Sequence, residues 1–219
     1  MVRPMTGQQG SQRGSGTPRP PLVIISGLGA PRAGAIAYGR YFQKRDHRVF
    51  TVPQRLLGYG DIRIAAGMVG GEIDRVRAIT GATKVNLVGM SLGGLIGLYY
   101  LKVAGGAPHV ERFISVGGPL SGSSLARVAQ LVPIDFVHSI AQTAPDSALM
   151  REVAAAPVPA GVRMISLGTR GDFLTPGPSR AAEGFEPVET PYGVCPVGHW
   201  MLFLDPRNQR AVAELLEGP

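Results

Sequence analysis

Residues 84–101 read "KVNLVGMSLGGLIGLYYL", and the fold can be worked out from this stretch outward. An apolar run with β-branched residues is followed by Ser91 between Gly89 and Gly93, and then by a second apolar run. The spacing matches G-x-S-x-G, in which small residues let a strand turn sharply into a helix and leave the serine hydroxyl above a sheet. Because the flanking runs supply that strand and that helix, the pattern predicts that Ser91 is a catalytic nucleophile.

The order of the apolar segments predicts an α/β fold. The strand candidates are short apolar runs rather than clean alternations, which is typical of parallel strands covered on both faces. Segments with helical periodicity alternate with them, and this favours a mostly parallel twisted sheet with helices on both faces. The expected strands lie at 21–30, 47–53, 84–90, 110–119 and 161–172, with a more polar sixth at 187–194. The expected helices lie at 61–82, stopped by Gly81, at 92–106, and at 205–218, started by Asp205 and Pro206.

The chain of 219 residues predicts one domain. Residues 1–20 are rich in Gly, Ser, Gln and Pro, so we expect a disordered tail followed by a single domain at 21–219. Residues from about 120 to 160 hold no strand signal, and their prolines limit each helix to a few turns. We expect this insertion to be a mobile helical cover over Ser91, with Phe136 and Ile140 as substrate-binding residues. The alternative is that its apolar residues form core helices on one face of the sheet.

Composition excludes several classes of protein. The formal charge is +7, but the arginines that carry most of it are scattered without interleaved aromatics, so we expect no nucleic-acid partner. No run approaches the roughly 20 apolar residues of a membrane span, so we expect no stable membrane insertion. The one cysteine, Cys195, cannot form an intramolecular disulfide, which fits a reducing compartment. We therefore expect a cytoplasmic monomer, or a secreted one if a native leader is missing from this chain.

A serine hydroxyl is a weak nucleophile at neutral pH, so it needs a general base and that base needs an orienting acid. With this strand–turn–helix motif the three follow in the order serine, acid, histidine. Of the four histidines, only His199 lies between the last strand candidate and the last helix. Asp172 follows a predicted strand before it, whereas Asp135 and Asp146 lie inside the insertion. The sequence therefore predicts Ser91, Asp172 and His199 as catalytic residues.

Attack on a carbonyl creates an oxyanion, which requires preorganised N–H donors. We expect one donor from Leu92, directly after the nucleophile, and one from Leu28 in the loop "SGLG" after the first strand. That loop could instead cradle a phosphate, but the glycine patterns of dinucleotide and nucleoside triphosphate sites are absent from the sequence. No metal-site pattern can be identified either, so we expect neither a cofactor nor a metal.

These motifs resemble those of the α/β-hydrolase superfamily, and within it the bacterial lipases and esterases of the class 2 type. The resemblance covers about residues 21–218 and is carried by "KVNLVGMSLGG", "FISVGGPLSGSSLA", "GDFLTPGPS" and "GHWMLFLDP". It implies hydrolysis of small esters or acylglycerols through an acyl-enzyme. Where this family often has a histidine, the chain has Ser26, before Gly27, and Met90. We expect Gly27 and Met90 to border the substrate and to affect substrate preference.

Two other functions are compatible with the same residues. An intracellular thioesterase or acyltransferase would use them on a thiol-carried acyl group, or with an acceptor other than water. The lack of a leader favours this reading, and relative rates on pantetheine and p-nitrophenyl esters separate it from an esterase. The non-enzymatic alternative is a binding protein that keeps the pocket. Labelling by a fluorophosphonate tests it, because a binding protein needs no activated serine.

Overall fold

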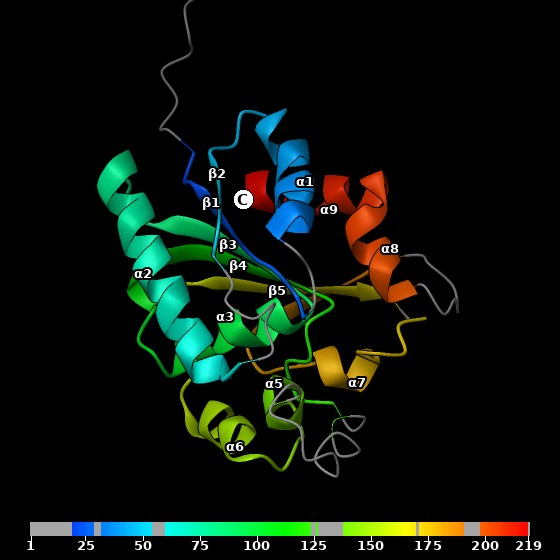
Figure 1. Ribbon diagram of the computed structural model, residues 1–219. Helices are drawn as coiled ribbons and strands as arrows, with labels where there is room; N and C mark the ends of the chain where they lie inside the picture. The colour runs from blue at the N-terminus through cyan, green and yellow to red at the C-terminus, as the bar shows by residue number, and fades with distance from the viewer. Residues whose placement is uncertain are drawn as a thin grey trace, which may run out of the picture.

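The computed structural model describes residues 19–28, 32–53, 60–123, 126, 138–169, 171–190 and 198–218. Its centre is a six-stranded sheet in the order β2-β1-β3-β4-β5-β6, in which every neighbouring pair is parallel (Figure 1). The strands are β1 (Leu22–Ile25), β2 (Val49–Thr51), β3 (Val85–Met90), β4 (Val110–Val116), β5 (Arg163–Thr169) and β6 (Phe185–Thr190). The predicted fold class is confirmed, whereas the predicted tail falls almost entirely on residues 1–18, outside the described part of the chain.

Helices cover both faces of this sheet (Figure 1). One face is covered by α2 (Ile62–Thr80), α3 (Leu92–Lys102) and α6 (Ala148–Ala155). The other is covered by α1 (Arg32–Gln43), α8 (Gly198–Leu204) and α9 (Pro206–Glu217). Three short elements complete the described helices: η2 (Ala107–His109), α5 (His138–Gln142) and α7 (Gly177–Arg180).

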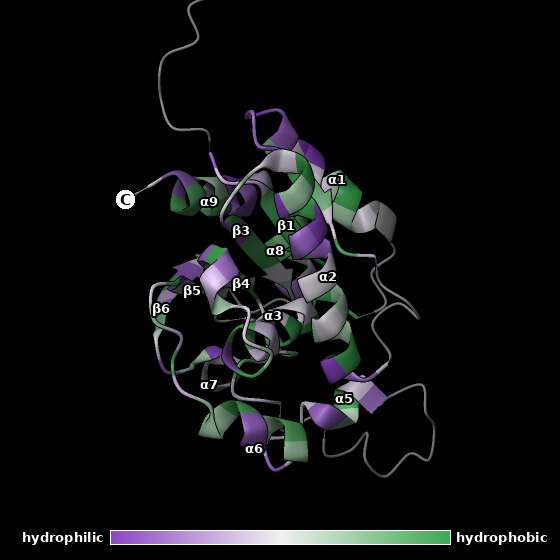
Figure 2. Cartoon of the chain, turned by 90° about the vertical axis from the view of Figure 1, so that its left-hand side faces the viewer, coloured by the Kyte–Doolittle hydropathy of each residue, from purple (hydrophilic) through white to green (hydrophobic). Residues whose placement is uncertain are grey.

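The apolar strands are explained by this double cover. In β1, Val23 and Ile25 face the cluster of α2 and α3, whereas Leu22 and Ile24 face the cluster of α1 and α9. Successive strand residues point to opposite faces, so a strand buried on both sides must be apolar throughout. Figure 2 shows hydrophobic residues along the central strands, while the outer helices carry hydrophilic residues as well.

Helix boundaries follow the predicted caps. Helix α2 ends at Gly81, which has φ 71° and donates its N–H to the carbonyl of Arg77. Glycine adopts this left-handed conformation without the steric cost of a Cβ. Helix α9 begins after Asp205, whose carboxylate accepts from the N–H of Arg207, with Pro206 as the first helical residue. The sequence predicted both of these boundaries.

Other elements depart from the expected boundaries. The sixth strand runs over 185–190 and starts two residues before the predicted segment. Helices α1 and α8 were not expected. The described part of the 120–160 insertion includes the short helices α5 and α6 and contains no strand. No helix in the described residues has the length and apolar character required to cross a membrane.

Candidate active site

Ser91 forms the turn between β3 and α3, with φ 52° and ψ −124°. A positive φ is unfavourable for a residue with a Cβ, and it folds the chain back so that the hydroxyl projects from the end of the strand. The turn is held on both sides, because the N–H of Ser91 donates to Val116 at 2.8 Å and its carbonyl accepts from Gly94 at 2.8 Å. The predicted strand–turn–helix setting of this serine is therefore present.

Glycine is required around the turn because neighbouring segments of the chain come too close to leave room for a Cβ. A Cβ on Gly89 would overlap the carbonyl of Gly93, and a Cβ on Gly93 would lie 2.5 Å from the carbonyl oxygen of Ile25. A Cβ on Gly27 would lie 2.9 Å from the Cβ of Ser91. Real Cβ atoms do not pack this closely, so steric exclusion explains the spacing of the motif.

His199 brings its ring to the serine from the second position of α8. Its Nε2 lies 2.9 Å from the Oγ of Ser91, and its Nδ1 lies 2.7 Å from Oδ2 of Asp172. The residue is 4% exposed, and its ring packs edge-on against Phe203. A Cβ on Gly117, which has φ 61°, would come within 3.3 Å of the imidazole, so glycine at this turn leaves room for the ring.

Asp172 follows β5, and both of its carboxylate oxygens are fully engaged. Oδ1 accepts from the N–H groups of Leu174 and Thr175, and Oδ2 accepts from the Thr175 hydroxyl at 2.7 Å and from His199. Burial raises the pKa of this carboxyl. The hydrogen bonds from His199 and Thr175 outweigh that effect and hold the pKa of Asp172 below its ordinary value. Asp172 is therefore an ionised acceptor that fixes the orientation of the imidazole.

Arg180, on α7, supports the loop that carries the acid. Its guanidinium donates to the carbonyls of Thr169, at the end of β5, and Thr175, at 3.1 and 3.0 Å. The side chain is buried against Gly168, where a Cβ would overlap the guanidinium. Burial lowers the pKa of Arg180, and the charge of Asp172 partly offsets this. Sequence reasoning missed both Thr175 and Arg180, since their roles depend on how the loop folds.

A cavity of about 180 Å³ opens beside Ser91. Its lining is mainly apolar and includes both predicted oxyanion residues, Leu28 and Leu92, and the predicted substrate-binding residue Ile140. The other apolar lining residues are Pro119, Ala126 and Leu174. Such a cavity suits an apolar group placed next to the serine hydroxyl.

The remaining predicted substrate-binding residues lie elsewhere. Met90 is buried in the core cluster on the α1 and α9 side and does not line the cavity. Gly27 is also absent from the lining and lies directly beneath the serine turn. Phe136 falls outside the described residues, as does the rejected acid candidate Asp135. The other rejected acid, Asp146, is exposed.

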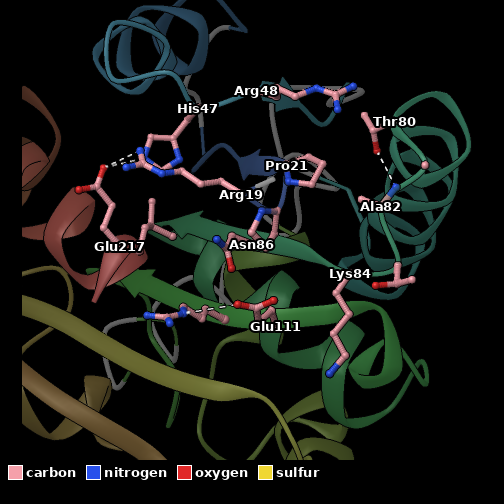
Figure 3. Close-up of a pocket in the computed structure, with 15 residues that line it drawn as sticks. Arg19, Pro21, His47, Arg48, Thr80, Ala82, Lys84, Asn86, Glu111 and Glu217 are labelled. Atoms are coloured by element: carbon pink, nitrogen blue, oxygen red, sulfur yellow. Dashed lines mark hydrogen bonds and ion pairs between the residues drawn. The ribbon is translucent and has the colours of Figure 1, made fainter. Parts of the chain in front are cut away.

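The three other histidines lie apart from this group. His138 is exposed on α5 and His109 ends η2. His47 is buried near Glu217, at the edge where the strands begin (Figure 3). In the described part of the chain, no three His, Cys, Asp or Glu side chains converge as potential metal ligands.

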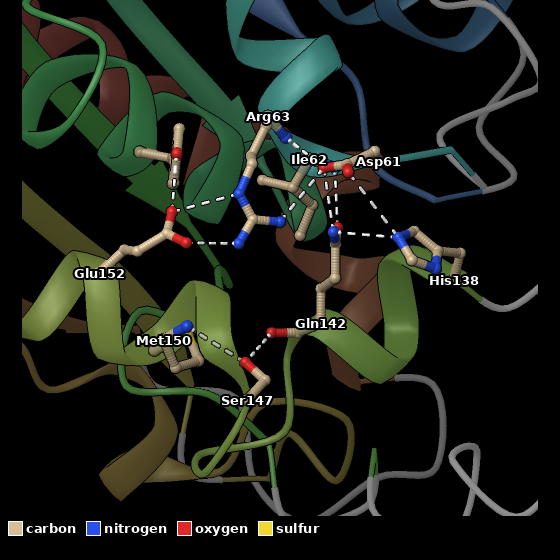
Figure 4. A network of polar contacts seen from close by, with 9 residues as sticks. Asp61, Ile62, Arg63, His138, Gln142, Ser147, Met150 and Glu152 are labelled. Carbon is tan, nitrogen blue, oxygen red and sulfur yellow. Dashed lines mark hydrogen bonds and ion pairs between the residues drawn. The ribbon is translucent and has the colours of Figure 1, made fainter.

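Helix α5 is bound to the start of α2 through Gln142 (Figure 4). Its Oε1 accepts from the N–H of Ile62 at 2.8 Å, and its Nε2 donates to Oδ1 of Asp61 at 2.9 Å. The first N–H groups of a helix have no partner within the helix, so Gln142 and the Asp61 cap together satisfy two of them. Gln142 lies between two cavity-lining residues, Ile140 and Thr143. These bonds therefore fix one wall of the cavity to the body of the protein.

Helix α6 is attached to α2 and α3 through Glu152 (Figure 4). Its carboxylate accepts from the guanidinium of Arg63 at 2.5 and 3.2 Å and from the hydroxyl of Tyr99 at 2.8 Å. Ser147 joins the two helices, because its hydroxyl donates to the Gln142 carbonyl and caps α6 at Met150. The described part of the insertion thus has fixed contacts with α2 and α3, and its predicted mobility stays a prediction.

The parallel sheet and the serine turn at its carboxyl edge together define an α/β hydrolase. The family model described as the alpha/beta hydrolase fold matches residues 20–146, and the chain belongs to that family. No curated protein matches the sequence.

Solved structures of lipases and esterases share the fold. The mature form of a Bacillus licheniformis lipase superposes with a TM-score of 0.72 at 15% identity, over 93% of this chain and 94% of that one. Lipase B from Aspergillus fumigatus gives 0.72 at 17% identity, over 91% of this chain and 52% of that one. An esterase from Rhodococcus sp. gives 0.59 at 18% identity, over 91% of both chains. At these identities the likeness is one of fold, so the substrate must be inferred from the site.

Proposed function

We propose that the protein is a cofactor-free serine hydrolase that cleaves carboxylic esters with an apolar acyl group. The observation that carries the proposal is the chain of two hydrogen bonds from Ser91 through His199 to Asp172, at 2.9 and 2.7 Å. A nucleophile within reach of a base that is itself oriented by a buried acid is the arrangement needed for acyl transfer. The family membership supports the same class of reaction.

Acylation begins when the Oγ of Ser91 attacks the ester carbonyl while the Nε2 of His199 takes the hydroxyl proton. The imidazolium is stabilised by the Asp172 carboxylate, which remains ionised. His199 then gives the proton to the departing alkoxide, so that an alcohol leaves and the acyl group stays on Ser91 as an ester. Both proton transfers use Nε2 of His199, because its Nδ1 is hydrogen-bonded to Asp172.

The tetrahedral intermediate carries a negative oxygen that we assign to the amides of Leu28 and Leu92. Leu92 is the first residue of α3, so its N–H has no acceptor within the helix and lies at the positive end of the helix dipole. Leu28 borders the same cavity from the loop after β1. Amide donors fixed before the reaction stabilise the developing charge without reorganisation.

Hydrolysis is completed by water. His199 takes a proton from a water molecule that attacks the acyl carbon, and it then returns that proton to Oγ as the carboxylic acid leaves. The acyl chain lies against the apolar lining of the cavity, including Ile140 on α5. All steps use side chains, two amides and water.

The test is labelling of the whole protein by a fluorophosphonate, together with hydrolysis of p-nitrophenyl esters of increasing acyl length. The wild-type chain should be labelled once, at Ser91, and Ser91→Ala should lose both labelling and hydrolysis while its melting temperature stays close to that of wild type. If Ser91→Ala keeps wild-type turnover, the nucleophile is a different residue. If pantetheine thioesters are cleaved faster than the matched oxygen esters, the enzyme is the thioesterase of the alternative reading.

A further inference from the structure

Ser123 brings a hydroxyl to the wall of the Ser91 cavity. It lies in the segment after β4, between two apolar lining residues, Pro119 and Ala126. Ser123 is 8% exposed, so it is buried apart from the cavity that it lines. None of the proposed steps of ester hydrolysis uses its hydroxyl.

The backbone around Ser123 is fixed on both sides. Its N–H donates to the carbonyl of Thr143, just after α5, at 2.7 Å, and its own carbonyl accepts from the N–H of Ala126 at 3.0 Å. Gly122, with φ 82°, permits this approach, because a Cβ there would lie 2.7 Å from the same Thr143 carbonyl oxygen. The position of Ser123 in the wall is therefore set by its main chain and not by its hydroxyl.

The hydroxyl of Ser123 has no hydrogen-bond partner among the described residues. A serine just before a helical turn can cap it through the hydroxyl, but the N–H of Ala126 donates to the Ser123 carbonyl instead. The unpaired hydroxyls of Ser115 and Ser139 are sealed inside the protein, whereas that of Ser123 keeps accessible surface, which faces the cavity. Alanine would make the same backbone bonds without placing an unpaired hydroxyl among apolar groups, so the hydroxyl is unfavourable unless a ligand pairs with it.

Thr143 lines the same wall, and its backbone bond to Ser123 makes the two residues neighbours. The Thr143 hydroxyl donates its proton to the carbonyl of Ile140 at 2.8 Å, so it can only accept from a further group. The Ser123 hydroxyl keeps its proton free to donate. A ligand hydroxyl suits this pair, because it can accept from one residue and donate to the other.

The rest of the lining limits the ligand further. The described residues that line the cavity include no charged side chain, so a charged ligand group would be desolvated there without a counter-charge. The polar group that Ser123 recognises is therefore neutral. At about 180 Å³ the cavity is also smaller than the roughly 300–1,000 Å³ of typical ligand pockets, which favours a short acyl chain.

We propose that the acyl group of the substrate is short and carries a hydroxyl, which pairs with Ser123 in the cavity. This inference rests on the proposed function, since it names the acyl group that Ser91 would receive. The ligand hydroxyl accepts from Ser123 and donates to Thr143, while the carbon chain contacts the apolar lining. Ser123 is thus a specificity-determining residue, because an acyl group without the hydroxyl leaves its side chain unpaired.

The test measures kcat/KM of the full chain for ethyl 2-hydroxybutyrate and ethyl 3-hydroxybutyrate, each as separate enantiomers. Each hydroxy ester is compared with the ester that has a methyl group in place of the hydroxyl, after correction for the rates at which hydroxide cleaves the two. Wild type should prefer at least one hydroxy ester over its methyl counterpart by about tenfold, the effect of one added hydrogen bond. Ser123→Ala should reduce that ratio to one or below, because the pocket then favours the methyl group.

Ser121→Ala is the matched control. It removes a serine hydroxyl from the same segment, but this hydroxyl donates to the carbonyl of Ala181, and Ser121 borders a different cavity. The Ser121→Ala variant should therefore keep the wild-type ratio. Melting temperatures of both variants check that each is folded.

The outcomes separate this inference from the proposed function. If wild type cleaves the methyl esters through Ser91 but shows no preference for a hydroxyl, or if Ser123→Ala keeps the preference, the inference is overturned and the proposed function stands. If wild type cleaves none of the esters, both fail. A preference for 2-hydroxyethyl butyrate over propyl butyrate that is lost in Ser123→Ala would place the hydroxyl on the alcohol part of the ester and overturn its assignment to the acyl group.

Discussion

Replacing Gln142 with leucine tests whether the cavity wall is fixed by the bonds between α5 and α2. Gln142 is 7% exposed, and its side chain accepts from the N–H of Ile62, a residue with no exposed surface. Leucine has a similar volume, so little cavity forms, but the amide of Ile62 is left buried without an acceptor. That loss costs about 1–3 kcal/mol. Asp61 keeps its bond to the N–H of Arg63, so the helix cap itself survives.

For a chain of this size, each kcal/mol lowers the melting temperature by about 2–4 °C, so a central loss of about 2 kcal/mol predicts a decrease of about 4–8 °C. Thermal unfolding followed by circular dichroism measures it, with Gln43→Leu, at an exposed position on α1, as the matched control. The control should remain within about 0.5 kcal/mol of wild type.

The same variant has a second readout. Ile140 and Thr143 flank Gln142 and line the Ser91 cavity, so Gln142→Leu should also change the ratio of long-chain to short-chain ester turnover. The reasoning fails if Gln142→Leu and Gln43→Leu melt within about 1 °C of each other. A lower melting temperature with an unchanged chain-length ratio would show that the bonds stabilise the fold without shaping the cavity.

Three further predictions concern the site itself. Asp172→Asn should cut turnover by about 10⁴ without unfolding the protein, because the imidazole loses its orienting anion, whereas Asp146→Asn should match wild type in a kcat measurement. Thr175→Val removes a hydrogen bond that lowers the pKa of Asp172, so the folded-state pKa should rise. The lowered pKa of Asp172 stabilises the folded protein at pH values above the pKa of the unfolded state, and this stability is lost as the pH falls through the folded-state pKa. Acid unfolding of Thr175→Val should therefore begin at a higher pH than acid unfolding of wild type. An unchanged acid midpoint in a pH titration of circular dichroism would contradict this. Ile140→Ala should change the ratio of long-chain to short-chain ester rates. A lowered melting temperature with the ratio preserved would instead place Ile140 among core residues.

The sheet could be predicted because the residues that form it carry a local signal. A strand buried on both faces must be a short apolar run, so a strand such as 22–25 can be recognised from the sequence alone. Gly81 and Asp205 mark helix ends because each caps a helix through hydrogen bonds to residues a few positions away in the sequence. The edge strand β6 is largely exposed and polar, so its boundaries were the least well defined.

The missed elements lack such a signal. Helix α8 has seven residues, and large apolar side chains such as Trp200 and Leu204 remain exposed on it, so no 3.6-residue pattern separates an inner face from an outer one. His199 could be predicted from chain order, but its placement on a helix could not. Helix α1 has apolar residues on its inner side, yet the two glycines and two arginines within it weaken the pattern.

The parts of the site that could not be predicted depend on contacts between distant segments. Thr175 and Arg180 serve the acid only because the loop after β5 folds back on itself. Thr175 and Arg180 belong to no motif, so only the folded loop shows which residues they contact.

The backbone of Ser91 has a consequence for the evolution of this protein. A non-glycine residue held at positive φ costs of order 1–3 kcal/mol, and glycine would occupy the same conformation with little strain. Selection for thermal robustness alone would therefore favour glycine at this position, and the nucleophile role that we propose for Ser91 opposes that change. Natural proteins are only marginally stable, so the remainder of the chain must retain enough reserve to tolerate the strained turn. Residue 91 is thus subject to two opposed selective pressures.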